Sequence, residues 1–142
     1  MDGPLYIDAS ALAKLFLPEP ESDELNRLLR GRRDLVVSDL AITETVSAAA
    51  RRLREGELSM RDAHRLHRAL LDSLESGHLL PARSTPATHR SAERFLLQPG
   101  LALRAADALH LAMAAQEQAR TLVTFDDRLR RAADELGLLV AP

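Results

Sequence analysis

The chain contains no cysteine, which excludes disulfide bonds, thiolate metal sites and cysteine nucleophiles. Any metal ligands must therefore be oxygen or imidazole groups. Tryptophan is also absent and aromatic residues make up only 3% of the chain, so no platform for stacking nucleic-acid bases is evident. Positive charge is not in excess. The net charge of −2 excludes nucleic-acid binding by bulk charge, so any such contact must be local.

Long apolar runs are missing as well. No stretch approaches the roughly 20 apolar residues that span a bilayer, and residues 1–4 lack the basic and apolar regions of a signal peptide. We therefore expect no membrane segment and a soluble, cytoplasmic protein. With 142 residues, 46% of them hydrophobic, the chain is long enough for one compact domain over residues 1–142.

Short apolar runs alternate with longer segments of helical periodicity along the chain. Prolines and glycines mark the breaks between them. Strands separated by helices predict a parallel sheet between helical layers, a three-layer α/β/α sandwich. We expect strands at 5–7, 35–37, 79–82, 121–125 and 138–140, and helices at 11–16, 21–29, 40–54, 59–74, 88–97, 104–115 and 128–136.

Two acids directly follow apolar strands. In LYIDASALAKLF, residues 5–16, Asp8 stands where the strand becomes a helix, and Asp126 follows the strand TLVTF in the same way. Ligands collect at the carboxyl ends of parallel strands, so both carboxylates are expected at one edge of the sheet. The alternative role for Asp8 is purely local, because Asp8 or Ser10 could simply cap the helix.

Two further acids have stronger structural explanations. Asp107 lies in the first turn of an otherwise apolar helix, where a carboxylate interacts favourably with the helix dipole by about 0.3–1 kcal/mol. His110, one turn later, is expected to fill a helix interface. Glu44 lies opposite the apolar stripe of its helix, where periodicity alone predicts a solvated side chain. Ser38 or Asp39 could cap that helix, and Asp39 is assigned to capping. The stripe consists of Ile42, Val46, Ala49 and Leu53.

A cluster of such acids would carry a definite chemistry. Carboxylates within about 4 to 6 Å raise one another's pKa, so they call for a compensating cation. Mg²⁺ and Mn²⁺ prefer carboxylate and water oxygens. An ion held in this way polarises a phosphodiester, generates hydroxide near neutral pH and stabilises the leaving oxygen. The carboxylate pattern therefore points to phosphodiester hydrolysis.

Four segments carry a resemblance to a known family. LYIDASAL, SDLAITETVSAAARR, LRAADALHLAMA and TLVTFDDRL, in this order and at these spacings, resemble the PIN-domain family and, within it, the VapC-like ribonuclease toxins of bacterial toxin and antitoxin pairs. The resemblance extends over essentially the whole chain. It implies a PIN-like fold and a Mg²⁺- or Mn²⁺-dependent endoribonuclease. The acidic residues of the family correspond here to Asp8, Glu44, Asp107 and Asp126.

The same resemblance suggests a role for each acid. Asp8 and Asp107 are the direct metal ligands. Glu44 helps to hold the ion or orients the attacking water. Asp126 completes the acidic pocket through a water molecule, and Asp127 either replaces Asp126 or supplements it.

Hydroxyl and basic groups would surround this pocket. Ser10 and Thr124 are candidates to hold a phosphate or a carboxylate by hydrogen bonds. An acidic pocket repels RNA, so a basic rim is expected to hold the phosphates. Two sets of arginines could supply the rim: Arg51, Arg52 and Arg54, or Arg128, Arg130 and Arg131. The alternative for any one of these arginines is a solvated charge on the helix surface.

The resemblance also implies partners. PIN toxins pair with a small antitoxin protein, a segment of which packs on the helices and reaches the active site. The helical pair 40–74 is the expected docking surface. Its leucines and methionines could equally form the core or a homodimer interface, and we expect a dimer. An alternative function is a PIN-like scaffold that holds a partner with little catalysis.

Other α/β classes fit the residues less well. Haloacid-dehalogenase phosphatases place a second aspartate two positions after the first, where this chain has Ser10. Response-regulator receivers expect a lysine near the site, and the only lysine here is Lys14, within the first helix. His64 and His67 share a helix face without a third ligand, and we interpret them as surface residues.

Overall fold

The computed structural model describes residues 1–142, and its centre is a five-stranded sheet in which every strand is parallel to its neighbours. The strand order is β3-β2-β1-β4-β5, so the first strand of the chain lies in the middle of the sheet. Each strand overlaps a segment in which the sequence predicts one. The strands are β1 (Leu5–Ile7), β2 (Leu35–Ser38), β3 (Leu80–Ala82), β4 (Thr121–Val123) and β5 (Leu139–Ala141).

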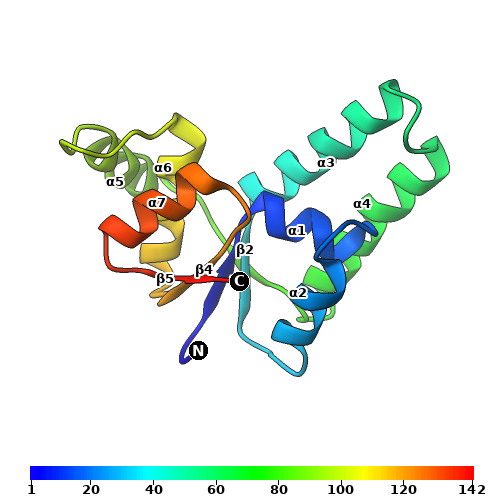
Figure 1. The fold of residues 1–142 in the computed structure, drawn as a ribbon, viewed down its shortest axis with the longest axis horizontal. Helices are drawn as coiled ribbons and strands as arrows, with labels where there is room; N and C mark the ends of the chain where they lie inside the picture. The colour runs from blue at the N-terminus through cyan, green and yellow to red at the C-terminus, as the bar shows by residue number, and fades with distance from the viewer.

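Seven helices cover the sheet (Figure 1). The first four lie on one side and the last three on the other. This arrangement confirms the predicted three-layer α/β/α sandwich. None of the helices is both long and apolar enough to cross a membrane. The helices are α1 (Ala9–Phe16), α2 (Ser22–Leu29), α3 (Asp39–Arg54), α4 (Met60–Glu75), α5 (Pro86–Leu96), α6 (Ala105–Gln116) and α7 (Asp127–Glu135).

The side chains of the central strand divide between the two faces of the sheet, as the alternation of a β-strand requires. Leu5 and Ile7 pack with Leu12 of α1 in one buried cluster. Tyr6 points the other way and packs with Leu111 of α6 in a second cluster. Full burial of a leucine-sized side chain stabilises a fold by about 1.5–3 kcal/mol. Each helical layer is therefore held on the sheet by its own core.

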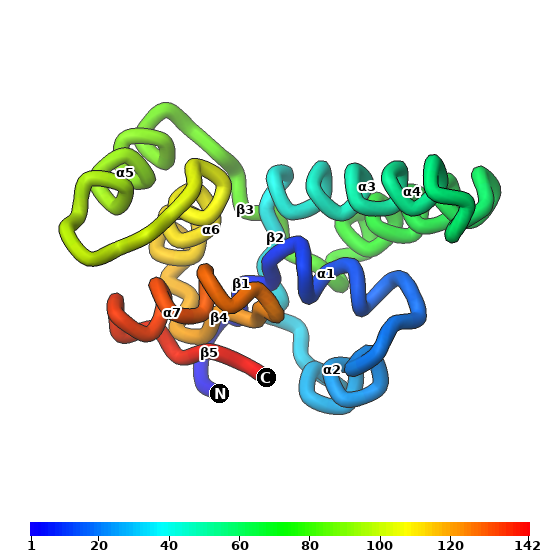
Figure 2. Tube along the Cα trace, turned by 45° about the horizontal axis from the view of Figure 1, so that its top comes forward, coloured from blue at the N-terminus to red at the C-terminus, as the bar shows by residue number.

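The α3–α4 pair forms a hairpin that extends beyond the edge of the sheet (Figure 2). Leu66 and Leu70 of α4 are buried in the first core cluster. In contrast, Met60 and Leu71 are 58% and 47% exposed. The hairpin thus contributes to the core and also carries exposed apolar surface, which leaves room for a docking role.

Short polar side chains begin the helices. Ser38, at the end of β2, caps α3 because its Oγ accepts the N–H of Ala41 at 3.0 Å. The assignment of Asp39 to capping is therefore wrong. The extended backbone of Ser38 places the serine hydroxyl at the free N–H groups of the first turn, and Asp39 is already the first helical residue.

Candidate active site

The ends of β1 and β4 bring the first candidate residues together. Ile7 lies opposite Val123 in the sheet, so the residues that follow, Asp8 and Thr124, are neighbours. The backbone N–H of Asp8 donates to the carbonyl oxygen of Val123 at 3.1 Å. The site therefore begins at the carboxyl edge of two adjacent parallel strands, where α/β proteins commonly bind ligands.

Asp8 is a buried carboxylate, with only 3% of the residue exposed. Its Oδ2 accepts the Thr124 hydroxyl at 2.5 Å, and its Oδ1 accepts the Ser10 hydroxyl at 2.7 Å. Oδ1 also accepts the N–H of Ala11 at 2.9 Å, so Asp8 caps α1. Capping and a place at the sheet edge are not alternatives here, because the cap itself holds the carboxylate at that edge.

Burial is the largest influence on the pKa of Asp8 and raises it. Hydrogen bonds from Thr124, Ala11 and Ser10 lower this pKa, and the nearby His110 does the same, but the net change is upward. A charged carboxylate is costly in a buried position unless a positive charge compensates it. The surroundings of Asp8 therefore favour binding of a cation.

Glu44 reaches from α3 to α6. Its Oε1 accepts a hydrogen bond from His110 Nε2 at 2.5 Å, and 36% of its side chain is exposed. Periodicity alone predicts a solvated Glu44, because by that pattern the large apolar residues of α3 mark the buried side of the helix. The buried side of this helix is formed by the small residues Ala41, Thr45 and Ala49. Glu44 lies one turn after Ala41 and flanks this buried side.

His110 belongs to a buried hydrogen-bonded chain that the sequence analysis missed. The residue is 4% exposed, as expected for a helix interface, and its Nδ1 lies 2.8 Å from the Tyr6 hydroxyl. The Tyr6 hydroxyl in turn donates to Ser38 Oγ at 2.7 Å. Polar side chains in apolar segments need partners when they are buried. That rule was the available signal for Tyr6 and His110, although it does not say which partners they have.

The Tyr6 hydroxyl stays protonated at neutral pH. Burial raises the pKa of Tyr6 well above its usual range, and the hydrogen bond with Ser38 lowers it by less. The charges of Asp8 and Glu44 raise this pKa further. Since both charges act on one phenol, Asp8 and Glu44 border the same region of the molecule.

Asp107 and Asp126 each make hydrogen bonds at the start of a helix. Asp107 Oδ2 accepts the N–H of Arg104 at 2.9 Å, at the beginning of α6. Asp126 caps α7, and its Oδ1 accepts the N–H groups of Arg128 and Leu129 at 2.8 and 3.0 Å. The guanidinium of Arg128 lies 3.8 Å from Asp107 Oδ2. The starts of α6 and α7 therefore meet through this ion pair.

The acidic side chains are suitable ligands for a hard divalent ion, although no three of them gather into a ready metal-binding group. Glu44, Asp107 and Asp126 each use one carboxylate oxygen in the contacts above. The second oxygen of each accepts no hydrogen bond within the chain. Asp127, the exposed first residue of α7, makes no side-chain hydrogen bond. The donor set therefore fits Mg²⁺ or Mn²⁺ in its chemistry.

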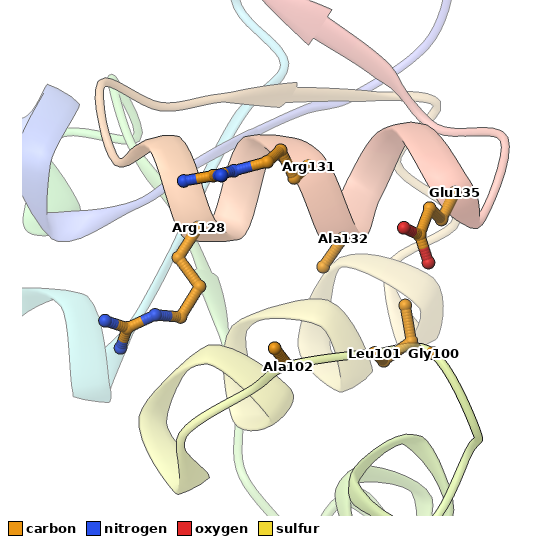
Figure 3. A pocket seen from close by; sticks show the side chains of 7 residues that line it. All are labelled: Gly100, Leu101, Ala102, Arg128, Arg131, Ala132 and Glu135. Carbon is orange, nitrogen blue, oxygen red and sulfur yellow. The ribbon is translucent and has the colours of Figure 1, made fainter.

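A groove of about 220 Å³ lies between α7 and the loop before α6, next to Asp107. Arg128 and Arg131 line it, and their guanidinium groups lie toward the start of α7, whereas Glu135 lies toward its end (Figure 3). Arg130 points elsewhere and donates to the backbone oxygens of Thr124 and Pro142. Of the two basic sets considered, the structure therefore places Arg128 of the second beside Asp107, and Arg131 lines the same groove.

The basic residues of α3 are arranged differently. Arg52 pairs with Glu19 at 3.3 Å and lies 3.7 Å from Glu57. Arg51 and Arg54 are exposed and form no ion pair. No hydrogen bond or ion pair joins this set to the acidic residues of the sheet edge.

An all-parallel sheet with Asp8 and Asp126 beyond the ends of β1 and β4 defines an α/β protein with acidic residues at the carboxyl edge of its sheet. The family model of the PIN domain matches residues 5–135, and the chain belongs to that family. A curated relative, Ribonuclease VapC46 of Mycobacterium tuberculosis, is 36% identical over 96% of this chain and 95% of its own.

Solved structures share the fold. The structure of Mycobacterium tuberculosis VapC20, described as a sarcin-ricin loop cleaving toxin, superposes with a TM-score of 0.72 at 18% identity, over 90% of this chain and 94% of that one. VapBC2 from Rickettsia felis, bound to a DNA fragment from the promoter, gives a TM-score of 0.66 at 17% identity, over 96% of both chains. These likenesses confirm the PIN-like fold predicted from the sequence.

Proposed function

We propose that the protein is a divalent-metal-dependent endoribonuclease with its active site at the carboxyl edge of the sheet. The observation that carries the proposal is the buried Asp8 carboxylate, held at the end of the central strand by two hydroxyls and a backbone N–H. A buried charge of this kind calls for a cation. Membership of the PIN family and 36% identity to a protein named as a ribonuclease support RNA as the substrate.

Four carboxylates would hold Mg²⁺ or Mn²⁺. Asp8 and Asp107 are proposed as direct ligands, and Glu44 and Asp126 would complete the site, the latter through a water molecule. Such an ion, when bound, polarises the phosphodiester and lowers the pKa of a coordinated water. The unengaged oxygens of Glu44, Asp107 and Asp126 support this assignment, because they are available to a ligand.

The two hydroxyls are proposed to orient Asp8 and not a phosphate. Ser10 and Thr124 both donate to the Asp8 carboxylate. Each also accepts a backbone N–H, from Phe125 at 2.8 Å and from Asp126 at 3.0 Å. Their hydrogen-bonding capacity is thus used within the chain. The free oxygen of Glu44 would orient the attacking water and accept its proton.

The groove beside Asp107 is proposed to hold the RNA backbone. Arg128 and Arg131 present guanidinium groups there, and planar guanidinium groups pair well with phosphate oxygens. Contacts of this kind position a nucleic acid without reading its sequence. They also offset the repulsion between the acidic pocket and the phosphates.

We further propose that the protein is a single PIN domain that acts in the cytoplasm as the toxin of a toxin–antitoxin pair. An apolar groove of about 380 Å³ lies between α1 and the α3–α4 hairpin and suits a segment of a small antitoxin. A second copy of the chain, forming a homodimer, is the competing occupant. The same groove favours the second candidate function, a partner-binding module with little catalysis. Its apolar lining comprises Phe16, Leu17, Pro18, Leu58, Leu66 and Ala69.

Metal-dependent RNA cleavage distinguishes these functions. Purified protein is incubated with structured and single-stranded RNA in the presence of Mg²⁺ or Mn²⁺, beside a chelator control and an Asp8→Asn variant. We expect cleavage by the wild type and its loss in both controls. Absence of cleavage across a broad RNA panel, together with no binding of either ion by calorimetry, would overturn the enzymatic proposal and favour the partner-binding module.

A further inference from the structure

A continuous chain of hydrogen-bonded side chains leads from Ser38, the cap of α3, to the carboxylate of Glu44 on the same helix. Ser38 Oγ accepts the N–H of Ala41 and the Tyr6 hydroxyl. The Tyr6 hydroxyl contacts His110 Nδ1 at 2.8 Å, and His110 Nε2 contacts Glu44 Oε1 at 2.5 Å. The rings of Tyr6 and His110 meet edge to face, with centroids 5.8 Å apart and planes at 65°. The imidazole is therefore fixed at both nitrogens and along its edge.

The contact with Glu44 requires a proton on one particular nitrogen. An ionised carboxylate can only accept hydrogen bonds, so His110 Nε2 must be the donor. The Tyr6 hydroxyl has a single proton, so while it donates to Ser38 Oγ it can only accept from Nδ1, and it can donate to Nδ1 only if the Ser38 hydroxyl becomes the donor of their shared bond. Because Nε2 is the donor, one Glu44 oxygen is held by the ring while the other stays free.

We propose that His110 is a positioning residue for Glu44, and that Tyr6 and Ser38 hold His110 in the orientation this requires. The inference rests on the proposed function, since it assigns the free Glu44 oxygen to the reaction. Glu44 is half exposed on a long side chain that would otherwise sample several rotamers. A carboxylate restrained on one oxygen presents the other in a single direction, which is the role that outer hydrogen bonds play for ligand and catalytic carboxylates.

The location of the chain argues against a purely structural role. A core position between β1 and α6 could be filled by apolar residues with no polar partner to satisfy, and buried polar groups are costly unless each is paired. Here all the pairing leads to one half-exposed acid at the site. Ser38 adds a second restraint, because its hydroxyl also caps the helix that carries Glu44.

The decisive comparison is between two amide substitutions at His110. The side-chain amide nitrogen of His110→Gln can reach the position of Nε2 and donate to Glu44, whereas that of His110→Asn matches Nδ1 and falls short. We expect kcat for RNA cleavage to fall about 10- to 100-fold in His110→Asn with little change in KM, and to be largely recovered in His110→Gln. His64→Gln, an exposed histidine on α4, is the matched control and should cleave like the wild type.

A second readout does not depend on RNA cleavage. Nitrogen-15 NMR of the metal-free full chain should show a proton on His110 Nε2 with the shift of a strong hydrogen bond, and Glu44→Ala should abolish that shift. Calorimetry with Mn²⁺ should show weaker binding in His110→Asn than in His110→Gln. Tyr6→Phe, which keeps the core shape, should broaden the His110 signals and lower kcat, which tests the chain even if a His110 variant fails to fold.

These results separate the two proposals. Equal kcat values in the wild type and both amide variants, or equal losses in the two variants, would overturn the positioning role while RNA cleavage by the wild type still stood. A wild type that cleaves no RNA would overturn the proposed function. The Nε2 proton and the Mn²⁺ affinities of the variants would then still decide whether His110 positions Glu44.

Discussion

Thr124 donates its hydroxyl proton to Asp8 across 2.5 Å, although 116 positions separate the two residues in the chain. The same hydroxyl oxygen accepts the backbone N–H of Asp126. One fully buried threonine therefore links the carboxylate at the end of the central strand to the acid that caps α7. This link makes the arrangement of two acids depend on a residue that need not touch substrate.

Replacement of this threonine tests the link. Thr124→Val preserves the shape of the side chain but removes the shortest hydrogen bond to the Asp8 carboxylate, which keeps those from Ser10 and Ala11, and leaves the Asp126 N–H without a partner. We expect the free energy of unfolding to fall by about 1–3 kcal/mol in urea titrations, because unpaired buried polar groups are costly. Thr124→Ser should restore most of it, and Thr43→Val, at an exposed position on α3, should change little. An unaltered unfolding midpoint in Thr124→Val would contradict this account.

The pH dependence of stability should reveal Asp8. Burial raises the pKa of Asp8 in the folded state above the ordinary value of 3.8, so the folded protein binds this proton more tightly than the unfolded chain. The stability contributed by this group is fully present below pH 3.8 and is lost as the pH rises through the raised pKa. In chelator, Asp8→Asn should therefore gain stability relative to the wild type as the pH rises toward neutral.

The relative gain in the stability of Asp8→Asn should disappear at lower pH, where the Asp8 carboxyl of the wild type is protonated. Urea titrations at several pH values measure the difference directly. Addition of Mn²⁺ should stabilise the wild type and not the variant. A difference in stability between the two proteins that stays constant throughout this range would show that burial of the charge carries no cost.

Two substitutions at Asp126 separate its structural and chemical roles. Asp126→Ala removes the cap of α7 and should cost about 0.5–2 kcal/mol of stability as well as cleavage. Asp126→Asn keeps a capping oxygen, so its stability should lie within a few tenths of a kcal/mol of the wild type. Its cleavage rate should nevertheless fall, because an amide is a weaker metal ligand than a carboxylate. If Asp126→Asn cleaves RNA at the wild-type rate, the role of Asp126 is limited to capping α7.

Neighbouring arginines on α7 should respond differently to alanine substitution. Arg131→Ala removes a phosphate contact in the groove, so we expect KM for RNA to rise and its dependence on salt to weaken, with stability unchanged. Arg130→Ala removes hydrogen bonds to the carbonyl oxygens of Thr124 and Pro142. It should mainly lower the unfolding midpoint. A reversed pattern would place the RNA backbone away from this groove.

Much of this structure follows from local signals in the sequence. The run Leu5–Ile7 before Asp8 and the run Thr121–Val123 before Thr124 each combine an apolar strand with a polar terminus, and parallel strands bring such termini to one edge. Prolines, glycines and capping residues mark the helix ends. Segments with consistent local signals are those that sequence reasoning predicts best.

The polar chain through His110 did not follow from local signals. Tyr6 and His110 are 104 positions apart, and their contact depends on which face of β1 the tyrosine occupies and on how α6 packs there. Glu44 was misplaced by periodicity because small residues form the buried side of its helix. Its inclusion in the site came from resemblance to the PIN family and not from the hydrophobic pattern.

The position of β1 between β2 and β4 has a consequence for synthesis of the protein on the ribosome. Asp8 is translated well before β4, the strand that precedes Thr124, and before α7, the helix that Asp126 caps. Domains fold during or after translation only as their segments become available. A nascent chain that has not yet reached β4 cannot complete this pocket, so a partly translated molecule should lack the proposed activity.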